Sequence, residues 1–185
     1  MAWKNDQVSE KETAKIIELA SSCLDLEGDY VEMGCYKGDT SLLLADILKE
    51  FDKELWIYDS FEGLPEKCEE DESVLGKDFK SGALFVTKRE VKQRFLRANL
   101  PLPVIKKAWF KDLKSDDLPG KIAFAFLDGD FYESIKDSLR LVVPKMVKDG
   151  VLVVHDYSNP ALPGVSKAVD EYASGKSFDF KIVLL

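Results

Sequence analysis

This sequence of 185 residues has few cysteines, no apolar stretch long enough to span a membrane and no recognisable secretion signal. Its three cysteines, Cys23, Cys35 and Cys68, are odd in number and contain no C-x-x-C pair, which argues against a disulfide framework and against a zinc finger. No apolar stretch approaches the roughly 20 residues needed to cross a bilayer, and the N-terminal segment lacks the apolar middle region of a secretion signal. We therefore expect reduced thiols and a cytoplasmic protein.

Positive charge is also in deficit. The chain has 26 Lys and Arg against 34 Asp and Glu, which gives a formal net charge of -8. A protein of that sign is repelled by the phosphates of nucleic acids and by anionic lipids. We therefore expect a small molecule or a protein as partner, with no nucleic acid and no membrane, and we make no prediction of the oligomeric state.

Apolar periodicity predicts strands and helices that alternate along the chain. The composition, 45% apolar and 32% charged, is typical of a globular domain, and the S-x-x-E capping box of Ser9 and Glu12 begins the first helix. Near-continuous apolar strands between amphipathic helices predict a parallel sheet covered on both faces. The expected strands are 30–34, 54–59, 104–110, 121–128, 150–156 and 178–185, and the expected helices begin near Thr13 and then cover 42–51, 87–100, 132–143 and 165–173.

A long irregular stretch separates the second predicted strand from the helix at 87–100. It contains the acidic run EKCEEDE, residues 66–72, which we interpret as a solvated face, with a mobile lid as the alternative. In the helix that follows, a stripe of apolar residues predicts a core-facing side, while the basic residues are expected to face solvent. The stripe consists of Val91, Phe95 and Leu96, and the basic residues are Lys88, Arg89, Lys92, Arg94 and Arg97.

Acidic residues finish the predicted strands. Glu32, Asp59, Asp128 and the pair His155-Asp156 stand at four strand ends. In an open α/β sheet ligands bind outside the carboxyl ends of the strands. A single acidic residue at a strand end is common, because Asp readily begins a turn. Several carboxylates at the same edge of the sheet repel each other unless a ligand or cation balances their charge. We therefore predict a crevice there that binds a positively charged ligand.

A ligand-binding strand-to-helix turn is predicted in VEMGCYKGDTS. Gly34 and Gly38 bracket the turn, and Thr40 and Ser41 begin a helix whose first N–H groups are free to face an anion. The spacing G-x-x-x-G differs from the G-x-G-x-x-G of dinucleotide sites, and Glu32 would repel a pyrophosphate. The amino-acid part of S-adenosylmethionine, with its cationic end, suits this turn better.

Asp59 ends the next predicted strand, 25 residues after Gly34. A carboxylate at this position can accept hydrogen bonds from both hydroxyls of a ribose, which indicates an adenosine-containing cofactor. The alternative interpretation is that Asp59 caps the turn that begins at Ser60.

The segment AFLDGDFYES places acids directly after an apolar strand. Asp128 ends this strand, and the following strand ends in His155 and Asp156. The three side chains suit a divalent cation, because carboxylate oxygens favour Mg²⁺ while the imidazole favours softer metals. Asp130 is the candidate general base for a substrate hydroxyl. His155, the one histidine of the chain, is alternatively a buried structural residue.

Taken together, these segments resemble the macrocin O-methyltransferase family of S-adenosylmethionine-dependent enzymes, which modify sugar hydroxyls of natural products such as macrolides and aminocoumarins. The resemblance runs from about Tyr30 to Ala173, and DSFEGLP together with LDGDFYES is its specific part. It is carried by VEMGCYKGDTS, YDSFEGLPE, SGALFVTKREVKQRF, KKAWFKDL, LDGDFYES and HDYSNPALPGVSKAVDEY.

The resemblance implies an α/β three-layer sandwich of the class I methyltransferase (Rossmann-like) type, with a mostly parallel sheet. The family fold has two closing strands and this sequence supplies one, so we expect the last closing strand to be missing. A single methyltransferase domain over residues 1–185 is implied, with S-adenosylmethionine as cofactor and a small polyhydroxylated or glycosylated molecule as hydroxyl acceptor. The deprotonated acceptor oxygen would attack the sulfonium methyl group in line, helped by positioning and charge matching.

The resemblance also assigns roles to residues. A divalent cation, with Mg²⁺ as the first candidate, would be held by Asp128 and Asp156, and Asp130 would be the general base. Asp128 counts as a cofactor-binding residue as well. The remaining cofactor-binding positions are Glu32, Gly34, Gly38, Thr40 and Ser41 for the methionine part, Asp59 for the ribose, and Ser60, Phe61, Ala108, Trp109 and Phe110 for the adenine.

Two positions depart from the family pattern. The family usually has two aspartates where this chain has His155-Asp156, and a glycine where it has Ala108. The loss of one carboxylate weakens a site for a hard cation, so His155 is a candidate base as well as a candidate ligand. The alternative function is a non-catalytic S-adenosylmethionine-binding protein with a degenerate metal site. A nicotinamide-dependent oxidoreductase would need a G-x-G-x-x-G turn, which the sequence lacks.

Overall fold

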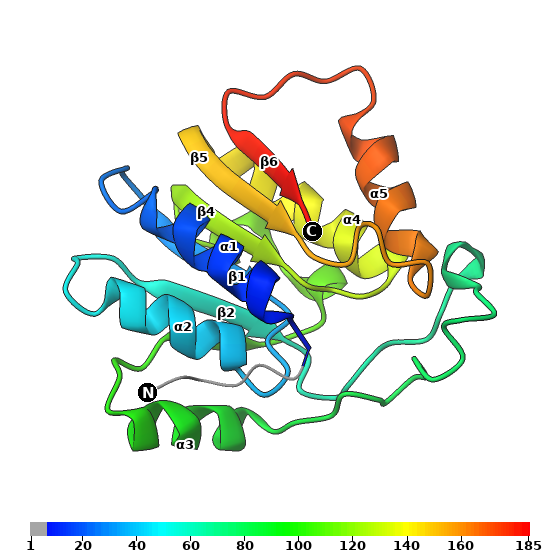
Figure 1. Cartoon of the computed structure of the whole chain (residues 1–185), viewed down its shortest axis with the longest axis horizontal. Helices are drawn as coiled ribbons and strands as arrows, with labels where there is room; N and C mark the ends of the chain where they lie inside the picture. The colour runs from blue at the N-terminus through cyan, green and yellow to red at the C-terminus, as the bar shows by residue number, and fades with distance from the viewer. Residues whose placement is uncertain (1–6) are drawn as a thin grey trace.

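A single parallel sheet organises the computed structural model, which describes residues 7–185 (Figure 1). In this part of the chain six strands lie in the order β3-β2-β1-β4-β5-β6, and each neighbouring pair is parallel. The predicted parallel sheet is thus confirmed, with β6 as one edge. The strands are β1 (Asp29–Met33), β2 (Leu55–Asp59), β3 (Val104–Lys107), β4 (Ile122–Leu127), β5 (Met146–Val154) and β6 (Lys181–Leu184).

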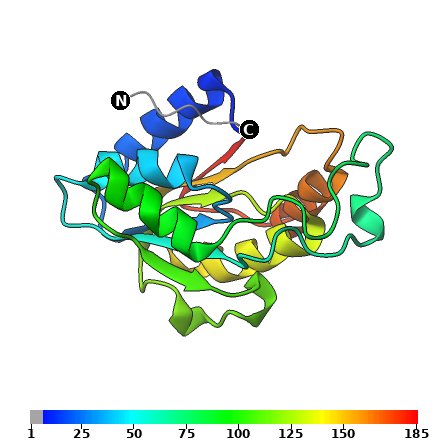
Figure 2. The ribbon, with the colours of Figure 1, turned by 90° about the horizontal axis from the view of Figure 1, so that it is seen from below.

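Helices cover both faces of the sheet, which gives the three layers expected (Figures 1 and 2). One face packs against α1, α2 and α3, and the other against α4 and α5. Along residues 7–185 none of the helices has the length and apolar character that crossing a membrane requires. The helices are α1 (Glu10–Ser21), α2 (Asp39–Leu48), α3 (Lys88–Ala98), α4 (Tyr132–Val142) and α5 (Pro163–Ala173).

Alternation of side chains along the strands creates a hydrophobic core on each face. All six residues of β4 are buried. Phe124 and Phe126 belong to the core under α1, α2 and α3, whereas Ala125 and Leu127 belong to the core under α4 and α5. Because side chains of a strand point alternately to the two faces, a continuous apolar run is what a strand covered on both sides requires.

The helix starts follow the capping signals of the sequence in two cases. The Ser9 side chain accepts from the backbone N–H of Glu12, whose carboxylate accepts from Ser9 in return, as predicted for α1. Thr87 and Glu90 form the same reciprocal arrangement at α3. Helix α4 differs, because its N-cap residue Phe131 supplies no side-chain hydrogen bond.

Several segment boundaries differ from those predicted; for example, β5 begins at Met146 instead of residue 150 and β6 begins at Lys181 instead of residue 178. Strand β3 ends at Lys107 instead of residue 110, because the backbone turns at Trp109 into the 3₁₀ turn Phe110–Asp112. Helix α2 ends at Leu48, so Phe51, which was expected on its apolar stripe, lies beyond the helix with 43% of its surface exposed.

The prediction for the faces of α3 is also only partly correct. Val91 and Phe95 are fully buried, but Leu96 is 64% exposed, because the next residue of a helix is turned by about 100° from its predecessor. Arg94 is not simply a solvent-facing charge, since its guanidinium forms an ion pair with Asp39 at the start of α2. Helix α3 is therefore joined to the turn between β1 and α2.

Backbone hydrogen bonds place four strand ends at one level. The N–H of Gly34 donates to Tyr58 (2.9 Å), that of Asp128 to Met33 (2.9 Å) and that of His155 to Leu127 (3.0 Å). With the parallel register, this brings Gly34, Asp59, Asp128 and His155 side by side at the carboxyl edge. The connections leave β1 toward β2 on one side and reach β4 on the other, and such a switch point is where open α/β sheets bind ligands.

Candidate functional site

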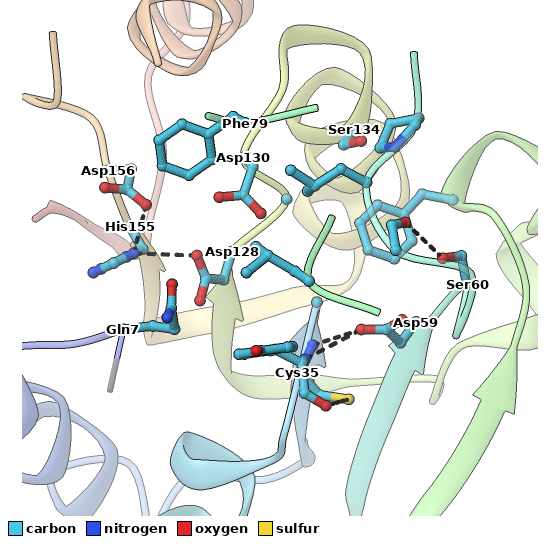
Figure 3. Close-up of a pocket in the computed structure, with 18 of the residues that line it drawn as sticks. Gln7, Cys35, Asp59, Ser60, Phe79, Asp128, Asp130, Ser134, His155 and Asp156 are labelled. Atoms are coloured by element: carbon cyan, nitrogen blue, oxygen red, sulfur yellow. Dashed lines mark hydrogen bonds and ion pairs between the residues drawn. The ribbon is translucent and has the colours of Figure 1, made fainter. Parts of the chain in front are cut away.

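A cavity of about 180 Å³ opens at this carboxyl edge (Figure 3). Its walls come from the turns that follow β1, β2, β3, β4 and β5, so residues far apart in the sequence face the same space. Ten of the predicted site residues line it: Gly34, Asp59, Ser60, Ala108, Trp109, Phe110, Asp128, Asp130, His155 and Asp156.

The other five predicted cofactor-binding residues, Glu32, Gly38, Thr40, Ser41 and Phe61, are buried and do not line the cavity. The Glu32 carboxyl group accepts a hydrogen bond from the Ser41 hydroxyl, which joins β1 to α2. Burial raises the pKa of Glu32 to about 8, and the neighbouring charges of Asp128 and Asp59 add to the effect, against the lowering by Ser41. At neutral pH Glu32 is therefore a neutral carboxylic acid.

Asp59 organises the cofactor side of the cavity through backbone hydrogen bonds. Its Oδ2 accepts from the N–H groups of Cys35 (2.9 Å) and Tyr36 (3.3 Å), and its Oδ1 accepts from that of Phe61 (2.7 Å). The carboxylate thus joins the turn after β1 to the turn after β2. A carboxylate has about four acceptor positions, so one stays open for a further donor.

His155 lies between two carboxylates at the other side of the cavity. Its Nδ1 is 3.1 Å from Asp128 Oδ1 and 2.9 Å from Asp156 Oδ2 (Figure 3). Burial lowers the pKa of His155, but the hydrogen bonds and negative charges of the two aspartates outweigh it and raise the pKa to about 11. His155 also lowers the pKa of Asp156, against the raising effect of burial. Without a metal the ring is an imidazolium that balances the two carboxylates.

The Asp130 carboxyl group enters the cavity beside this trio. Burial, with the negative charges of Asp128 and Asp156, raises the pKa of Asp130 well above its usual range, while the positive charge of His155 opposes the shift. No described residue donates a hydrogen bond to its carboxyl group. Asp130 therefore has open acceptor positions, but its raised pKa favours the protonated carboxyl group, which can accept a proton only after it has lost its own.

Four turns around the cavity contain a residue in the left-handed region of φ that is not glycine. They are Tyr36 (φ 44°), Phe61 (φ 51°), Asp130 (φ 59°) and Asp156 (φ 60°), which follow β1, β2, β4 and β5. Aspartate adopts this conformation more readily than tyrosine or phenylalanine. Such strain is typical of functional sites, where the surrounding structure must hold it.

Several cavity residues were missed by the sequence interpretation. Cys35 and Asn159 lie inside motifs that the resemblance quotes, so position within those motifs was an available signal. The same signal covered Gly63, Leu64, Pro65 and Leu84, whereas no motif or periodicity marked Phe79. The lining residues not predicted are Gln7, Cys35, Tyr36, Gly63, Leu64, Pro65, Phe79, Leu84, Gly129, Ser134 and Asn159.

The trio of Asp128, His155 and Asp156 has the donor set of a metal site, because one potential ligand atom from each residue lies within 4.8 Å of the others. His155 Nδ1 lies 2.9 Å from Asp156 Oδ2 and 3.1 Å from Asp128 Oδ1, which is close enough for the three residues to hold one ion together. The residues thus fit a divalent cation once His155 Nδ1 is deprotonated.

The parallel sheet with helices on both faces is the fold of the class I methyltransferases. The chain is similar to the solved structure of the O-methyltransferase NovP, with a TM-score of 0.78 and 29% sequence identity over 91% of this chain and 74% of that chain. The chain belongs to the macrocin-O-methyltransferase (TylF) family, whose model matches residues 13–183.

Two curated relatives are similar over most of this chain. One is 8-demethyl-8-(2,3-dimethoxy-alpha-L-rhamnosyl)-tetracenomycin-C 4'-O-methyltransferase of Streptomyces olivaceus, 30% identical over 154 residues. The other is demethyldecarbamoylnovobiocin O-methyltransferase of Streptomyces niveus, 31% identical over 156 residues. The alignments cover 78% and 80% of this chain, but only 58% and 59% of these relatives.

Replacement of Glu32 by Gln tests the protonation state of this buried acid. The pKa of Glu32 is higher in the folded state, about 8, than its ordinary value of 4.5, so the folded protein binds the proton more tightly. The free energy of unfolding of the wild type should therefore decrease as the pH rises from 5 to 8, roughly the interval between the two pKa values.

The Glu32→Gln variant cannot ionise, so its stability relative to wild type should increase over that interval by on the order of 3 kcal/mol. Urea unfolding at pH 5, 6, 7 and 8 measures the difference. Glu50→Gln, at an exposed position, is the control and should show no such trend. A constant difference between Glu32→Gln and wild type would contradict the assignment.

Proposed function

We propose that this protein is an S-adenosylmethionine-dependent O-methyltransferase that acts on a hydroxyl group of a small polyhydroxylated or glycosylated molecule. The observation that carries the proposal is the cavity, in which a cofactor side at Gly34 and Asp59 adjoins a catalytic side at Asp128 and Asp130. Family membership supports it, and the named relatives are O-methyltransferases. We further propose a single cytoplasmic methyltransferase domain.

One side of the cavity would bind the cofactor, and the other would bind the acceptor and remove its proton. S-adenosylmethionine supplies a methyl group on a positively charged sulfur. Asp59 holds the turns after β1 and β2 and keeps an acceptor position for the ribose, while Trp109 and Phe110 offer an apolar wall for the adenine. The negative charges of Asp128 and Asp156 favour a cationic sulfur at short range. The catalytic side then has to orient a hydroxyl group and remove its proton.

Asp130 is the better supported general base. Its carboxyl group faces the cavity and, once it has lost its own proton, its raised pKa makes it a strong acceptor, whereas the His155 Nδ1 is engaged with its two carboxylate partners. Asp130 would take the hydroxyl proton while the acceptor oxygen bonds to the methyl carbon and the carbon–sulfur bond breaks, so that S-adenosylhomocysteine leaves as a neutral thioether. The positive charge on sulfur and the negative charge that develops on the acceptor oxygen are both lost in this step. Because charge disappears, an apolar wall favours the transition state over the charged reactants.

A divalent cation fits the catalytic side as a second component. Asp128, His155 and Asp156 would hold it, and it would lower the pKa of a nearby acceptor hydroxyl. Because one of the three donors is an imidazole, we propose a preference for Mn²⁺ or a similar ion over Mg²⁺, which prefers oxygen ligands.

Methyl transfer to defined glycosides tests the proposed function. The protein is incubated with labelled S-adenosylmethionine, with and without divalent ions, and with demethyldecarbamoylnovobiocin or the rhamnosylated tetracenomycin named for the first relative. Transfer of label to a hydroxyl group of either compound supports the proposal. Binding of S-adenosylhomocysteine without transfer under any condition would favour the non-catalytic alternative, and the absence of both would contradict the whole assignment.

Substitution of Asp130 by Asn should lower kcat by about a hundredfold or more, because the amide cannot accept the hydroxyl proton. Affinity for S-adenosylhomocysteine, measured by calorimetry, should stay close to that of wild type, since the cofactor side is unchanged. Asp116→Asn, at an exposed position, serves as the control for removal of one carboxylate. Wild-type turnover in Asp130→Asn would exclude this residue as the base.

His155→Asp should increase Mg²⁺ affinity by about tenfold or more, because it replaces the imidazole by a carboxylate that suits a hard cation. Without metal the variant places three acids together, so its melting temperature should fall and Mg²⁺ should restore it. His155→Asn is the matched control, which removes the imidazole without adding a charge. Titration calorimetry and thermal unfolding with Mg²⁺ and Mn²⁺ provide the measurements, and an unchanged Mg²⁺ affinity would indicate that the histidine is structural.

A further inference from the structure

The segment of residues 64–84, here called the strap, forms part of the cavity wall although it has almost no regular structure. Backbone hydrogen bonds from Leu64 to Ala83 (2.8 Å) and from Gly82 to Leu64 (2.9 Å) close its base. Phe79 and Leu84 of the strap line the cavity, and Figure 3 shows the Phe79 ring near the carboxyl group of Asp130. The strap is therefore placed to contact the acceptor.

Asp71 is the buried acid of the strap. The acidic run was expected to be solvated, but Asp71 is only 2% exposed, which corrects that interpretation for this residue. Its Oδ1 accepts from the backbone N–H of Tyr132 (2.7 Å), the first residue of α4. Its Oδ2 accepts from the N–H and the thiol of Cys68, each at 3.1 Å. Asp71 thus supplies the helix cap that Phe131 lacks.

A third segment packs against the same carboxylate. A Cβ atom added at Gly164, in the first turn of α5, would lie 2.0 Å from Asp71 Oδ1, so only glycine allows this approach. Two contacts nearby join the same parts of the chain: the Ser73 hydroxyl donates to the Pro160 carbonyl (2.8 Å), and Lys167 pairs with Glu70 (3.3 Å). The strap is therefore fastened to the starts of both α4 and α5.

These contacts connect Asp71 to the catalytic side and not to the cofactor side. The turn from Asp128 to Tyr132 contains Asp130, whose left-handed φ depends on how that turn is held. The turn after His155-Asp156 leads directly to Gly164. By contrast, the carboxyl ends of β1 and β2, which carry the cofactor side, have no contact with Asp71 among the hydrogen bonds and ion pairs of the described residues.

We propose that Asp71 is a positioning residue of the acceptor half of the site, which fixes the strap wall and the Asp130 turn relative to each other. This inference rests on the proposed function. A buried carboxylate is costly unless it is fully hydrogen-bonded, and the three donors of Asp71 come from two segments whose relative placement sets the shape of the acceptor pocket. Loss of Asp71 should therefore disturb acceptor binding and proton removal while it spares the cofactor.

Two variants separate the two groups of contacts. Asp71→Ala removes both, whereas Asp71→Asn keeps an oxygen for the Tyr132 N–H but loses one acceptor for Cys68. Glu69→Gln is the matched control, because it removes a charge from an exposed position in the same 3₁₀ turn, η1 (Glu69–Asp71).

Amide hydrogen exchange measured by mass spectrometry tests whether Asp71 holds the strap and the Asp130 turn in place, and it needs no methyl acceptor. In Asp71→Ala, amides of the strap and of residues 129–136 should exchange at least about tenfold faster, while those of β1 and β2 keep their protection. Asp71→Asn should restore protection of residues 129–136 but not of the strap. Uniform loss of protection throughout the sheet would show a role in global stability only and would overturn the proposal, as would unchanged exchange in Asp71→Ala.

Kinetics with demethyldecarbamoylnovobiocin supply the functional readout. Asp71→Ala should raise the KM for this acceptor and lower kcat/KM by about tenfold or more. Its dissociation constant for S-adenosylhomocysteine should stay within about threefold of wild type, because distant sites act independently. Equal losses of cofactor affinity and acceptor kinetics would overturn the proposal. If the wild type transfers no methyl group to either glycoside, the proposed function fails, whereas the exchange experiment still decides whether Asp71 positions these segments.

Discussion

Repulsion among carboxylates at one edge of the sheet is the constraint that the site has to satisfy. Backbone hydrogen bonds bring the ends of β1, β2, β4 and β5 to one level, and three of these ends carry acids into the same cavity. The acids meet this repulsion differently: Asp59 accepts from three backbone N–H groups, Asp128 and Asp156 lie against His155, and the pKa of Asp130 is raised so that its neutral form is favoured. The proposed cofactor side therefore contains a carboxylate held by backbone N–H groups, whereas the proposed catalytic side contains carboxylates beside a histidine.

His155 gives this chain an internal cation where the family pattern has a carboxylate. The two carboxylates raise the pKa of His155 against the effect of burial, which favours a positively charged ring between Asp128 and Asp156, and the three residues also form a cluster that could hold a metal ion. Proton and metal ion therefore compete for one nitrogen atom.

The catalytic side is built largely from segments without regular structure. The strap, the turn after β4 and the turn before α5 meet at the carboxylate of Asp71, and they surround the space beside Asp130. The sheet thus positions Gly34 and Asp59, whereas the wall beside Asp130 is built from loops that contact the buried Asp71. This chain spans less than three fifths of the two curated relatives described above.

The sequence by itself determined the parallel sheet, because continuous apolar strands such as β4 and amphipathic helices such as α1 are local patterns with one favourable way to bury their surface. It also determined that Asp59, Asp128, His155 and Asp156 meet, since parallel strands bring their carboxyl ends to one edge. Only the tertiary structure decided that Glu32 lies under the cavity beside Ser41, that Phe79 forms part of the wall, and that Asp71 caps a helix 61 residues away. Burial and hydrogen-bond partners of this kind depend on contacts between distant segments, which leave no periodic trace in the sequence.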